Sequence, residues 1–556
     1  MTTPIRLDSL TFSDSTEVPA SKDSIVVLVG PNNSGKSRAL REIREHLTGG
    51  REPKVVPAAT FTKLVDQDGV KEWLRQHAHV YWEGDGEKLM RPLAGQVHFS
   101  MVDHWWNQGP PFGNLGPFFV MLADTQSRLL LAVSVDSIDT VTQVPSAPLH
   151  ELFIDPDLET QLADAAERAF GTSLAVNRVA GSKTHLHVGS VDVPGPCDGT
   201  NKAYTKALAE LPLVQDEGDG VRSYIGLLLA VTATQYPLVL VDEPEAFLHP
   251  PQASQLGREL ATLRDEDTQL VVATHSSHLL QGLLDTQGAN VTVVRLTRDG
   301  SKNVASVLGR EQLRTLWSDP ILRYSALLDG LFHRGVVLCE SDSDCRFYQA
   351  TLEATLLRDG KPAHDLLFTH TGGKDRLPTA ITALRAIKVD VQVIADFDVL
   401  ARETLVKQLV EGLGGKWSEI ERDWKVVSSA IKQLGSAPPM TAVRTELEQA
   451  LSAITDATLT RDAAQQLRGI VKLEDGWSRA KQGGLSALPQ GAASESGKRL
   501  VSALGAMGLY VVPVGELERW APSIAGHGPQ WTAGALEVKI HEQTGEHAEF
   551  AERLVR

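Results

Sequence analysis

The chain has 556 residues, which is enough for about three or four domains with well-buried cores. Charged residues make up 22% and hydrophobic residues 42%, and the net charge of −16 argues against a wholly basic surface that wraps nucleic acid. The sequence has no apolar run long enough to span a membrane, and because MTTPIRLDSL lacks the basic and apolar pattern of a cleavable leader, we expect none. Its three cysteines lack metal-ligand spacing, so we expect a cytoplasmic protein without disulfides.

The first motif, GPNNSGKS, follows an apolar segment that predicts a buried strand and precedes a helical pattern. It fits the pattern G-x-x-x-x-G-K-[ST], in which glycines turn backbone N–H groups toward phosphate and the helix N-terminus adds positive charge. The pattern predicts that Lys36 reaches the β and γ phosphates and that Ser37 ligates Mg²⁺, with a glycine-rich surface turn as the simpler alternative. The candidate nucleotide-binding residues of this loop are Gly30, Asn33, Gly35, Lys36 and Ser37.

Residues from about 50 to 215 form an expected insert between this loop and the next motif. Segments 97–106 and 128–137 alternate or run apolar, as strands do, whereas segment 158–170 has the period of an amphipathic helix. We therefore predict antiparallel strands and a helical lobe in this part of the chain.

A glycine-rich turn, EGDGVRS, leads directly into an apolar helical segment that ends near Val231. The helix N-terminus could bind phosphate through Gly218 and Gly220, because its free N–H groups point toward a ligand there. An ordinary capped core helix is the alternative.

Two apolar segments that follow end in polar residues suited to catalysis. The first, PLVLVDEPE, reads as a strand buried on both faces and ends on Asp242 and Glu243. Carboxylates at the carboxyl end of a parallel strand can hold Mg²⁺ beside a nucleotide and polarise the attacking water. The second, VVATHSSHLL, contains His275, which could contact the γ phosphate or serve as a structural histidine.

The order of these four motifs resembles that of the ABC-type ATPases of the RecF and SMC group. The resemblance implies that Asp242 is a Mg²⁺ ligand and that Glu243 orients the hydrolytic water. It also implies that His275 is a switch histidine and that the turn with Gly218 and Gly220 caps ATP on a partner copy. It also implies a homodimer or a higher homo-oligomer formed through the ATPase domains. The usual Ser-Gly-Gly signature reads Gly-Asp-Gly here, so the serine contact is missing.

We place a domain boundary at 332/333, because the following segments have a different organisation. The next strand delivers Glu340 at its end, with Asp344 one helical turn later. A further strand ends in Asp396 and Asp398, and two residues apart on an extended chain these carboxylates point to the same side. Such carboxylates together bind one or two Mg²⁺ ions, although any one of them alone is more often a solvated strand-end residue.

These acids in a βαβ pattern resemble a Toprim domain, in which Lys374 either contacts phosphate or belongs to a plain turn. The segments GPNNSGKS and DEPEAFLHP resemble the OLD (overcoming lysogenization defect) nucleases and their Gabija-type relatives. The resemblance implies that Glu518, in VVPVGELERWAP, is a second-metal ligand, and Glu516 takes a place that the family often fills with a small polar residue.

The OLD family also uses a late lysine that stabilises the transition state. His547 stands at the corresponding place in this sequence, so Lys539 and Lys498 are the alternatives for this catalytic role. Residues from about 402 to 500 have a helical pattern and read as an insertion in the Toprim domain.

The sequence thus predicts a multidomain α/β protein. An ABC-type P-loop ATPase head with an antiparallel arm and a helical lobe occupies residues 1–332, and a Rossmann-like Toprim nuclease domain occupies residues 333–556. The resemblance implies an ATP-regulated, Mg²⁺-dependent DNA endonuclease in bacterial antiphage defence, with ATP and Mg²⁺ as cofactors and Mn²⁺ as an alternative ion in the Toprim site.

The expected partners are double-stranded DNA, further copies of the chain and a second defence protein. Two other functions fit the sequence. One is an ATP-driven repair or structural clamp that binds DNA without cutting it, and the other is an ATP-binding sensor that controls a partner effector.

Overall fold

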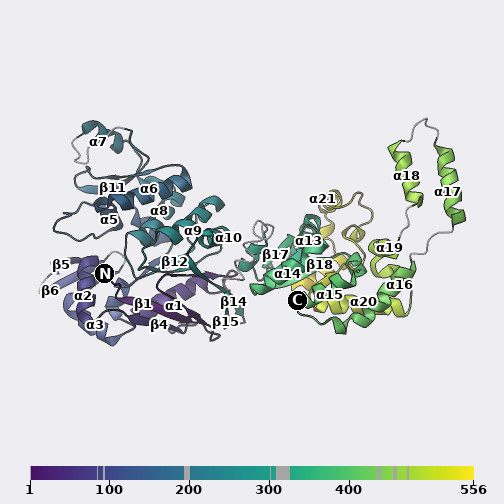
Figure 1. The fold of residues 1–556 in the computed structure, drawn as a ribbon, viewed down its shortest axis with the longest axis horizontal. Helices are drawn as coiled ribbons and strands as arrows, with labels where there is room; N and C mark the ends of the chain where they lie inside the picture. Colours follow the sequence, from purple (N-terminus) through teal and green to yellow (C-terminus); the bar gives the residue numbers. More distant parts are fainter. Residues whose placement is uncertain are drawn as a thin grey trace. The chain divides into compact units, whose positions relative to one another are not determined.

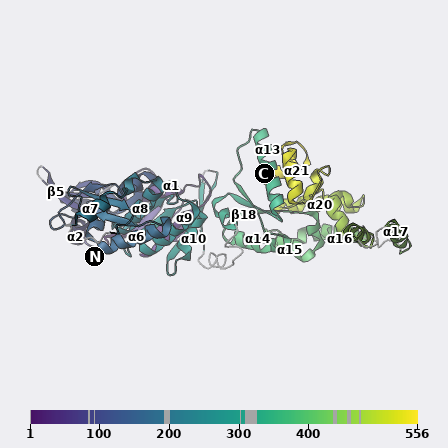
Figure 2. The same cartoon turned by 90° about the horizontal axis from the view of Figure 1, so that it is seen from above.

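The computed structural model describes residues 2–83, 86–91, 94–192, 201–300, 302–308, 326–434, 440–454, 460–471 and 475–555. The chain divides into two compact units, Met1–Thr315 and Leu316–Arg556. Figure 1 labels the elements of both units, and Figure 2 shows them from above. Among the described residues, no helix is both long and apolar enough to cross a membrane.

The first unit is built on a six-stranded sheet with the order β15-β14-β3-β13-β12-β8. Neighbouring strands are parallel except in the β14–β15 hairpin. Every residue of β3 and β13 is buried, which is typical of strands covered by helices on both faces. The strands are β3 Ser24–Val29, β8 Val120–Ala123, β12 Leu238–Asp242, β13 Gln269–Ala273, β14 Asn290–Asp299 and β15 Lys302–Leu308.

The predicted nucleotide motifs lie at the edge of this sheet where its parallel strands end. The phosphate loop follows β3, the acidic pair ends β12, and His275 follows β13. Asp242 and Ala273 are register partners, so the ends of β12 and β13 are level with each other. The helices that follow these segments or precede β12 are α1 Lys36–Thr48, α8 Asp219–Thr232, α9 Pro250–Leu263 and α10 Ser277–Asp285.

The other described residues of the first unit include three small antiparallel sheets and several helices. The sheets have the orders β2-β1-β4, β5-β6-β7 and β10-β11-β9. The strands are β1 Ile5–Thr11, β2 Glu17–Pro19, β4 Ala58–Lys63, β5 His79–Glu83, β6 Gly86–Arg91, β7 Gly95–His98, β9 Val135–Asp136, β10 Leu174–Asn177 and β11 Lys183–Val188. The helices are α2 Gln67–His77, α3 Val102–Gln108, α4 Thr125–Leu131, α5 Pro148–Ile154, α6 Pro156–Phe170 and α7 Lys202–Ala209.

The strand predictions for two apolar segments of the insert are wrong in part. Residues 128–131 belong to helix α4, which the Asp124 carboxylate caps by accepting from the Ser127 N–H at 2.8 Å, whereas Val135–Asp136 form the short strand β9. Segment 97–106 leaves β7 at His98 and enters α3. Short apolar runs fit a buried helix as well as a strand, and here the helix-starting residue decides between them.

The second unit is built on a four-stranded, fully parallel sheet with the order β17-β16-β18-β19. The strands are β16 Gly335–Cys339, β17 Leu366–His370, β18 Asp390–Ala395 and β19 Leu509–Val511. Helices α13 Asp342–Arg358 and α21 Pro529–Glu537 lie side by side (Figures 1 and 2). The short 3₁₀ helix Ala326–Phe332, which precedes our predicted boundary at 332/333, packs on β16 and β17 and so lies in this unit.

Helices fill the remaining part of the second unit, including the expected insertion from about 402 to 500. They are α14 Leu377–Ala386, α15 Glu403–Gly412, α16 Glu421–Leu434, α17 Met440–Ala453, α18 Arg461–Val471, α19 Gly476–Gly483, α20 Ala492–Ala506 and α22 Glu546–Glu552. Helix α19 contacts the 3₁₀ helix Phe397–Ala401, which directly follows β18. The insertion therefore reaches back to the end of the sheet.

Helix α19 also packs, backbone against backbone, on the loop that follows β19. The Leu485 N–H donates to the Pro513 carbonyl at 2.8 Å. A Cβ at Gly484, where φ is +52°, would lie 2.0 Å from the Pro513 oxygen, and a Cβ at Gly515 would lie 2.1 Å from the Lys481 oxygen. Only glycine fits these positions, so this contact fixes the place of Lys481.

We expect Gly484→Ala to lower the free energy of unfolding of the second unit by about 1–3 kcal/mol, because its methyl group would meet the Pro513 carbonyl. Gly505→Ala, in α20 of the same unit, is the matched control. Its Cβ would come no closer than 3.9 Å to Tyr510, and alanine favours a helix by about 0.5–1 kcal/mol. Urea unfolding followed by circular dichroism measures both variants, and equal effects would contradict the close backbone contact.

Candidate nucleotide and metal sites

The phosphate loop has a backbone geometry suited to a chain of phosphates. Gly30 and Gly35 have φ values of +139° and +98°, and a Cβ at Gly30 would lie 2.0 Å from the Leu296 carbonyl oxygen. Lys36 is buried, and its Nζ donates to the carbonyls of Gly30 and Pro31 at 2.7 and 2.9 Å. The ammonium group thus lies in the curl of the loop, where nucleotide phosphates would compete for it.

Ser37 and Asp242 meet at the end of the sheet. The Ser37 hydroxyl donates to the Asp242 carboxylate at 2.9 Å. Burial raises the pKa of Asp242, an effect that the Ser37 hydrogen bond reduces and the adjacent Glu243 charge increases. The Ser37 hydroxyl oxygen and the Asp242 carboxylate oxygen are both ligands that Mg²⁺ prefers, so this pair fits the Mg²⁺ ion that accompanies ATP. Asn33 is exposed in the loop and has a φ of +62°.

Glu243, His275 and Glu245 form a row at the ends of β12 and β13. The Glu243 side chain is 49% exposed, and its Oε1 lies 3.7 Å from Nε2 of His275. The Glu245 carboxylate accepts from the His275 N–H at 2.6 Å, and burial raises the pKa of Glu245. Glu243 has a φ of +47°, which is uncommon for a residue with a side chain. Neighbouring groups must therefore hold this backbone.

Arg128, which no motif of the sequence indicated, is the neighbour that holds it. Its buried guanidinium donates from Nη1 to the Asp242 carbonyl and from Nη2 to the Glu243 carbonyl, both at 2.9 Å. Helix α8 packs on the Arg128 backbone, since a Cβ at Gly226 would lie 1.9 Å from the Arg128 oxygen. The sequence signal that could have revealed Arg128 is its place in an apolar segment. A charged side chain that is buried with such a segment requires hydrogen-bond partners.

The predicted glycine turn lies at the N-terminus of α8. Gly218 is the N-cap, and no atom would lie within 4 Å of a Cβ added there. Gly220 is more confined, because its Cβ would lie 2.8 Å from the Phe247 carbonyl oxygen. Asp219 pairs with Arg222 at 2.9 Å, so the charge of the aspartate in the signature is balanced within the same helix.

Three of the predicted acids of the second unit meet just beyond the carboxyl ends of β16 and β18. Asp396 follows β18 directly, but Asp398 lies in the 3₁₀ helix Phe397–Ala401 and not on an extended chain as predicted. One carboxylate oxygen from each of Glu340, Asp396 and Asp398 lies within 4.8 Å of the others, and we call this group the strand-end cluster. Burial raises the pKa of Glu340 to about 7, against the effect of Lys374 and together with that of Asp398. Burial and the Glu340 charge also raise the pKa of Asp396 well above its usual range.

The strand-end cluster has the donor set of a divalent cation site. Lys374 Nζ pairs with Asp398 Oδ2 at 2.7 Å, whereas Asp398 Oδ1 is buried with no hydrogen-bond partner in the described part of the chain. Three half-buried carboxylates this close together repel one another unless a cation or protons neutralise them. Mg²⁺ and Mn²⁺ both accept carboxylate oxygens, so the residues present fit such an ion.

Asp344 lies close enough to this cluster to influence it, and it also caps helix α13. The Ser341 N–H and hydroxyl donate to Asp344 Oδ2 at 2.9 and 2.8 Å. Burial raises the pKa of Asp344, the Ser341 hydrogen bonds lower it, and the Glu518 charge raises it further. Asp344 is therefore an electrostatic neighbour of Glu518 as well as of Asp396.

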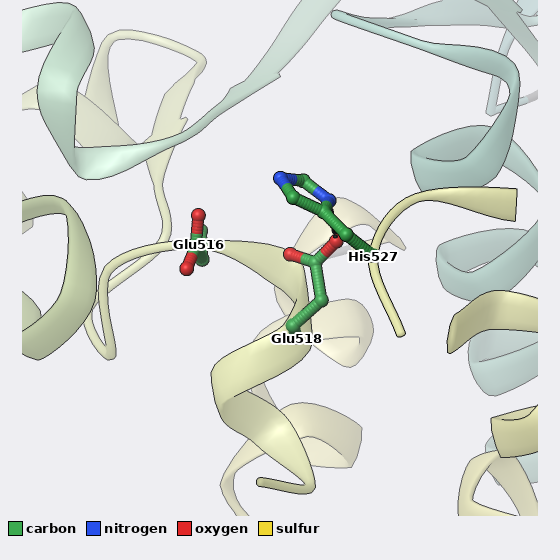
Figure 3. Close-up of side chains that lie close together, drawn as sticks. All are labelled: Glu516, Glu518 and His527. Atoms are coloured by element: carbon green, nitrogen blue, oxygen red, sulfur yellow. Dashed lines mark ion pairs between the residues drawn. The ribbon is translucent and has the colours of Figure 1, made fainter. Parts of the chain in front are cut away.

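A second group, the loop cluster, consists of Glu516, Glu518 and His527 (Figure 3). One ligand atom of each residue lies within 4.8 Å of the others. Glu518 pairs with Nδ1 of His527 and accepts from the Gly528 N–H at 2.7 Å. Both glutamates lie in a segment that the sequence pattern indicated, whereas His527 lies in a glycine-rich loop that carries no strand or helix pattern.

A lysine of the helical insertion lies between the two clusters. Lys481 Nζ is 3.5 Å from Asp396 Oδ2 and 3.9 Å from Glu516 Oε2. Burial lowers the pKa of Lys481, but the combined charges of the surrounding acids, with Asp396 first among them, raise it overall. Sequence order could not reveal this lysine, because α19 reaches the acids only through tertiary packing.

The residues named for the late catalytic role have other contacts. Lys539 and Lys498 pair with glutamates three residues away along the chain, at 3.0 and 3.3 Å. His547 is buried, and its Nε2 lies 2.9 Å from a backbone carbonyl oxygen. A catalytic role for Lys539 or His547 stays a prediction, whereas Lys481 contacts the acids directly.

Comparisons with known proteins agree with the nucleotide motifs. Residues 201–281 match the family described as "AAA domain, putative AbiEii toxin, Type IV TA system". The Old nuclease of Escherichia phage P2 is 24% identical over 176 residues, which cover 31% of this chain and 29% of that nuclease. The chain therefore contains an AAA-type ATPase domain and is distantly homologous to the Old nuclease over less than a third of that protein's length.

Similar solved structures include two SMC head domains. The Smc head from Pyrococcus furiosus with an extended coiled coil, bound to the C-terminal domain of ScpA, is 10% identical; the match covers 57% of this chain and 99% of that one, with a TM-score of 0.31. The SMC head domain from Thermotoga maritima is 12% identical; the match covers 56% of this chain and 100% of that one, with a TM-score of 0.28.

We expect Arg128→Met to lower the turnover number for ATP hydrolysis by about 10–100-fold and to change ATP affinity by less than about threefold. The reason is that Arg128 holds the Asp242 and Glu243 backbone and does not belong to the phosphate loop. Steady-state phosphate release and binding of a fluorescent ATP analogue separate the two quantities.

Arg264→Met is the matched control, because Arg264 also donates to two backbone carbonyls of the first unit, those of Thr268 and Asp23. Equal losses of affinity and turnover in both variants would point to a general folding defect and contradict the positioning role of Arg128.

Proposed function

We propose that this protein is an ATP-regulated, Mg²⁺-dependent DNA endonuclease of the OLD type, with an ABC-type ATPase head and a Toprim nuclease domain. The strand-end cluster carries the proposal: three carboxylates from the ends of adjacent parallel strands in a chain distantly homologous to a nuclease. By the same resemblance, we propose a role against phage in the bacterial cytoplasm.

The acids of the second unit would hold the ions of the nuclease site. Glu340, Asp396 and Asp398 offer carboxylate oxygens to one ion, and Asp344 and Glu518 extend the negative surface toward a second one. A divalent ion bound there supplies Lewis acidity, which activates water and neutralises charge on the scissile phosphate.

Two lysines give the same site its positive charge. Lys374 lies 2.7 Å from Asp398, and Lys481 lies 3.5 Å from Asp396. An ion that takes over these carboxylates would release both ammonium groups toward a DNA phosphate, where they can bind and orient it. Lys481 is therefore our candidate for the basic residue that stabilises the transition state.

The first unit would bind ATP at the carboxyl edge of its sheet. Lys36 binds the β and γ phosphates, Ser37 and Asp242 hold Mg²⁺, and Glu243 orients the hydrolytic water with His275 beside it. The accessible N-terminus of α8 supports capping of ATP on a second copy of the chain, so we propose a homodimer or a higher homo-oligomer.

Asp396→Asn should reduce nicking of supercoiled DNA in Mg²⁺ or Mn²⁺ by at least about 100-fold, because the cluster loses the charge of a central ligand. Asp375→Asn is the matched control, since Asp375 is an exposed aspartate of the same unit that pairs with Arg402. Gel separation of supercoiled and nicked plasmid measures both variants. Equal cutting by wild type and Asp396→Asn would refute the assignment of the nuclease site.

Glu243→Gln should bind ATP with nearly unchanged affinity and release phosphate at least about 100-fold more slowly, because the amide cannot accept a proton from water. The variant should then remain in the ATP-bound state. Addition of ATP would therefore change its nicking rate to a new value that persists. Wild-type protein should return to the ATP-free rate as ATP is consumed. Indistinguishable time courses would contradict regulation by ATP.

A second candidate function is a DNA clamp whose second unit binds DNA without cutting it. The ion pair between Lys374 and Asp398 favours it, because a lysine can replace a metal ion in neutralising a buried carboxylate. The Gly-Asp-Gly signature without its serine also favours it. Retention of DNA by a protein that hydrolyses ATP but shows no metal-dependent nicking would support this function.

A further inference from the structure

His527 stands on a turn that has a glycine on each side. Gly526 and Gly528 have φ values of +104° and +55°, which residues with side chains rarely adopt. The His527 side chain is 76% exposed, yet its Nδ1 contacts the Glu518 carboxylate. The turn thus holds the exposed His527 imidazole against the Glu518 carboxylate.

The two glutamates of the loop cluster are much less exposed than the histidine. Their side chains are each 13% exposed. The Gly528 N–H fixes the Glu518 carboxylate, while Glu516 lies 3.9 Å from Lys481 and 3.5 Å from Arg519 Nε. The loop cluster is therefore a pair of partly buried carboxylates with an exposed imidazole beside them, and Figure 3 shows the three side chains.

The loop cluster differs from the strand-end cluster in its donor atoms. The strand-end cluster offers carboxylate oxygens alone, whereas the loop cluster adds an imidazole nitrogen. Mg²⁺ prefers oxygen ligands and keeps much of its water, while Mn²⁺ and later divalent transition metals accept imidazole nitrogen readily. The two clusters should therefore favour different ions.

We infer that the loop cluster binds a divalent transition-metal ion of the Mn²⁺ type, with His527 as its nitrogen ligand and Glu516 and Glu518 as its oxygen ligands. The inference rests on the proposed function only in taking the second unit to bind divalent ions. His527 thereby sets the ion preference of this site, and the all-oxygen strand-end cluster keeps its preference for Mg²⁺.

Lys481 connects the two clusters in this arrangement. An ion in the loop cluster would bind the Glu516 carboxylate, which lies beside Lys481 in the absence of an ion. The Lys481 ammonium would then interact with Asp396 and with a bound phosphate. Occupation of the loop cluster thus changes the charge that the strand-end cluster experiences. The identity of the ion in one cluster consequently affects the other.

Pulsed electron paramagnetic resonance of Mn²⁺ tests the inference on the full chain after removal of metals with EDTA. We expect ¹⁴N coupling of an imidazole to bound Mn²⁺ in the wild type and its loss in His527→Gln. The matched control is His541→Gln, because His541 also lies near a glutamate, with Nε2 3.8 Å from Glu542. Calorimetric titration should show Mn²⁺ affinity at one site falling roughly tenfold or more in His527→Gln, with Mg²⁺ affinity changed by less than about threefold.

His527→Asp replaces the neutral imidazole nitrogen with an anionic carboxylate oxygen. We expect this variant to bind Mn²⁺ without ¹⁴N coupling and to bind Mg²⁺ better than the wild type. Absence of ¹⁴N coupling in the wild type, or its persistence in His527→Gln, would overturn the inference. The measurement requires no DNA, so ¹⁴N coupling in a protein that does not nick DNA would refute the endonuclease and leave the metal assignment standing.

Discussion

Repulsion among carboxylates held at the ends of buried parallel strands is the constraint on which both sites depend. A parallel sheet brings the carboxyl ends of its strands to one edge, where Asp242 meets Ser37 in one unit and Asp396 meets Glu340 in the other. Burial raises the pKa of each of these acids, which means that the folded chain makes their ionised forms costly. Cations lower that cost, and the protein's own lysines and arginines supply only part of the charge.

Contacts made with the backbone fix the positions of the groups around these acids. Arg128 holds the carbonyls of Asp242 and Glu243, so the left-handed turn at Glu243 is tied to a helix that packs on α8. In the second unit, the close approach at Gly515 places Lys481 beside the acids. In both units a helix from elsewhere in the sequence, α4 or α19, is tied to a charged site. Movement of that helix would therefore move groups of the site.

Short motifs of the sequence predicted the relationship to known proteins. The P-loop pattern and the order of the motifs led to an ATPase related to the OLD nucleases, and the AAA-domain match and the distant homology to the Old nuclease confirm that recognition. The α/β class with parallel sheets also follows from apolar strands that end in polar residues. The strand prediction for segment 128–137 holds only for Val135–Asp136, because residues 128–131 belong to helix α4 and a buried helix and a buried strand have the same apolar composition.

The sequence by itself determined the residues whose chemistry depends on neighbours along the chain, such as the P-loop and the pair Asp396 and Asp398. Their geometry is local, since one turn or one strand end places them. Only the tertiary structure places Arg128, Lys481 and His527 beside the acids of the candidate sites or their backbone. These residues reach the acids through packing between segments far apart in the chain, and no local pattern records a contact of that kind.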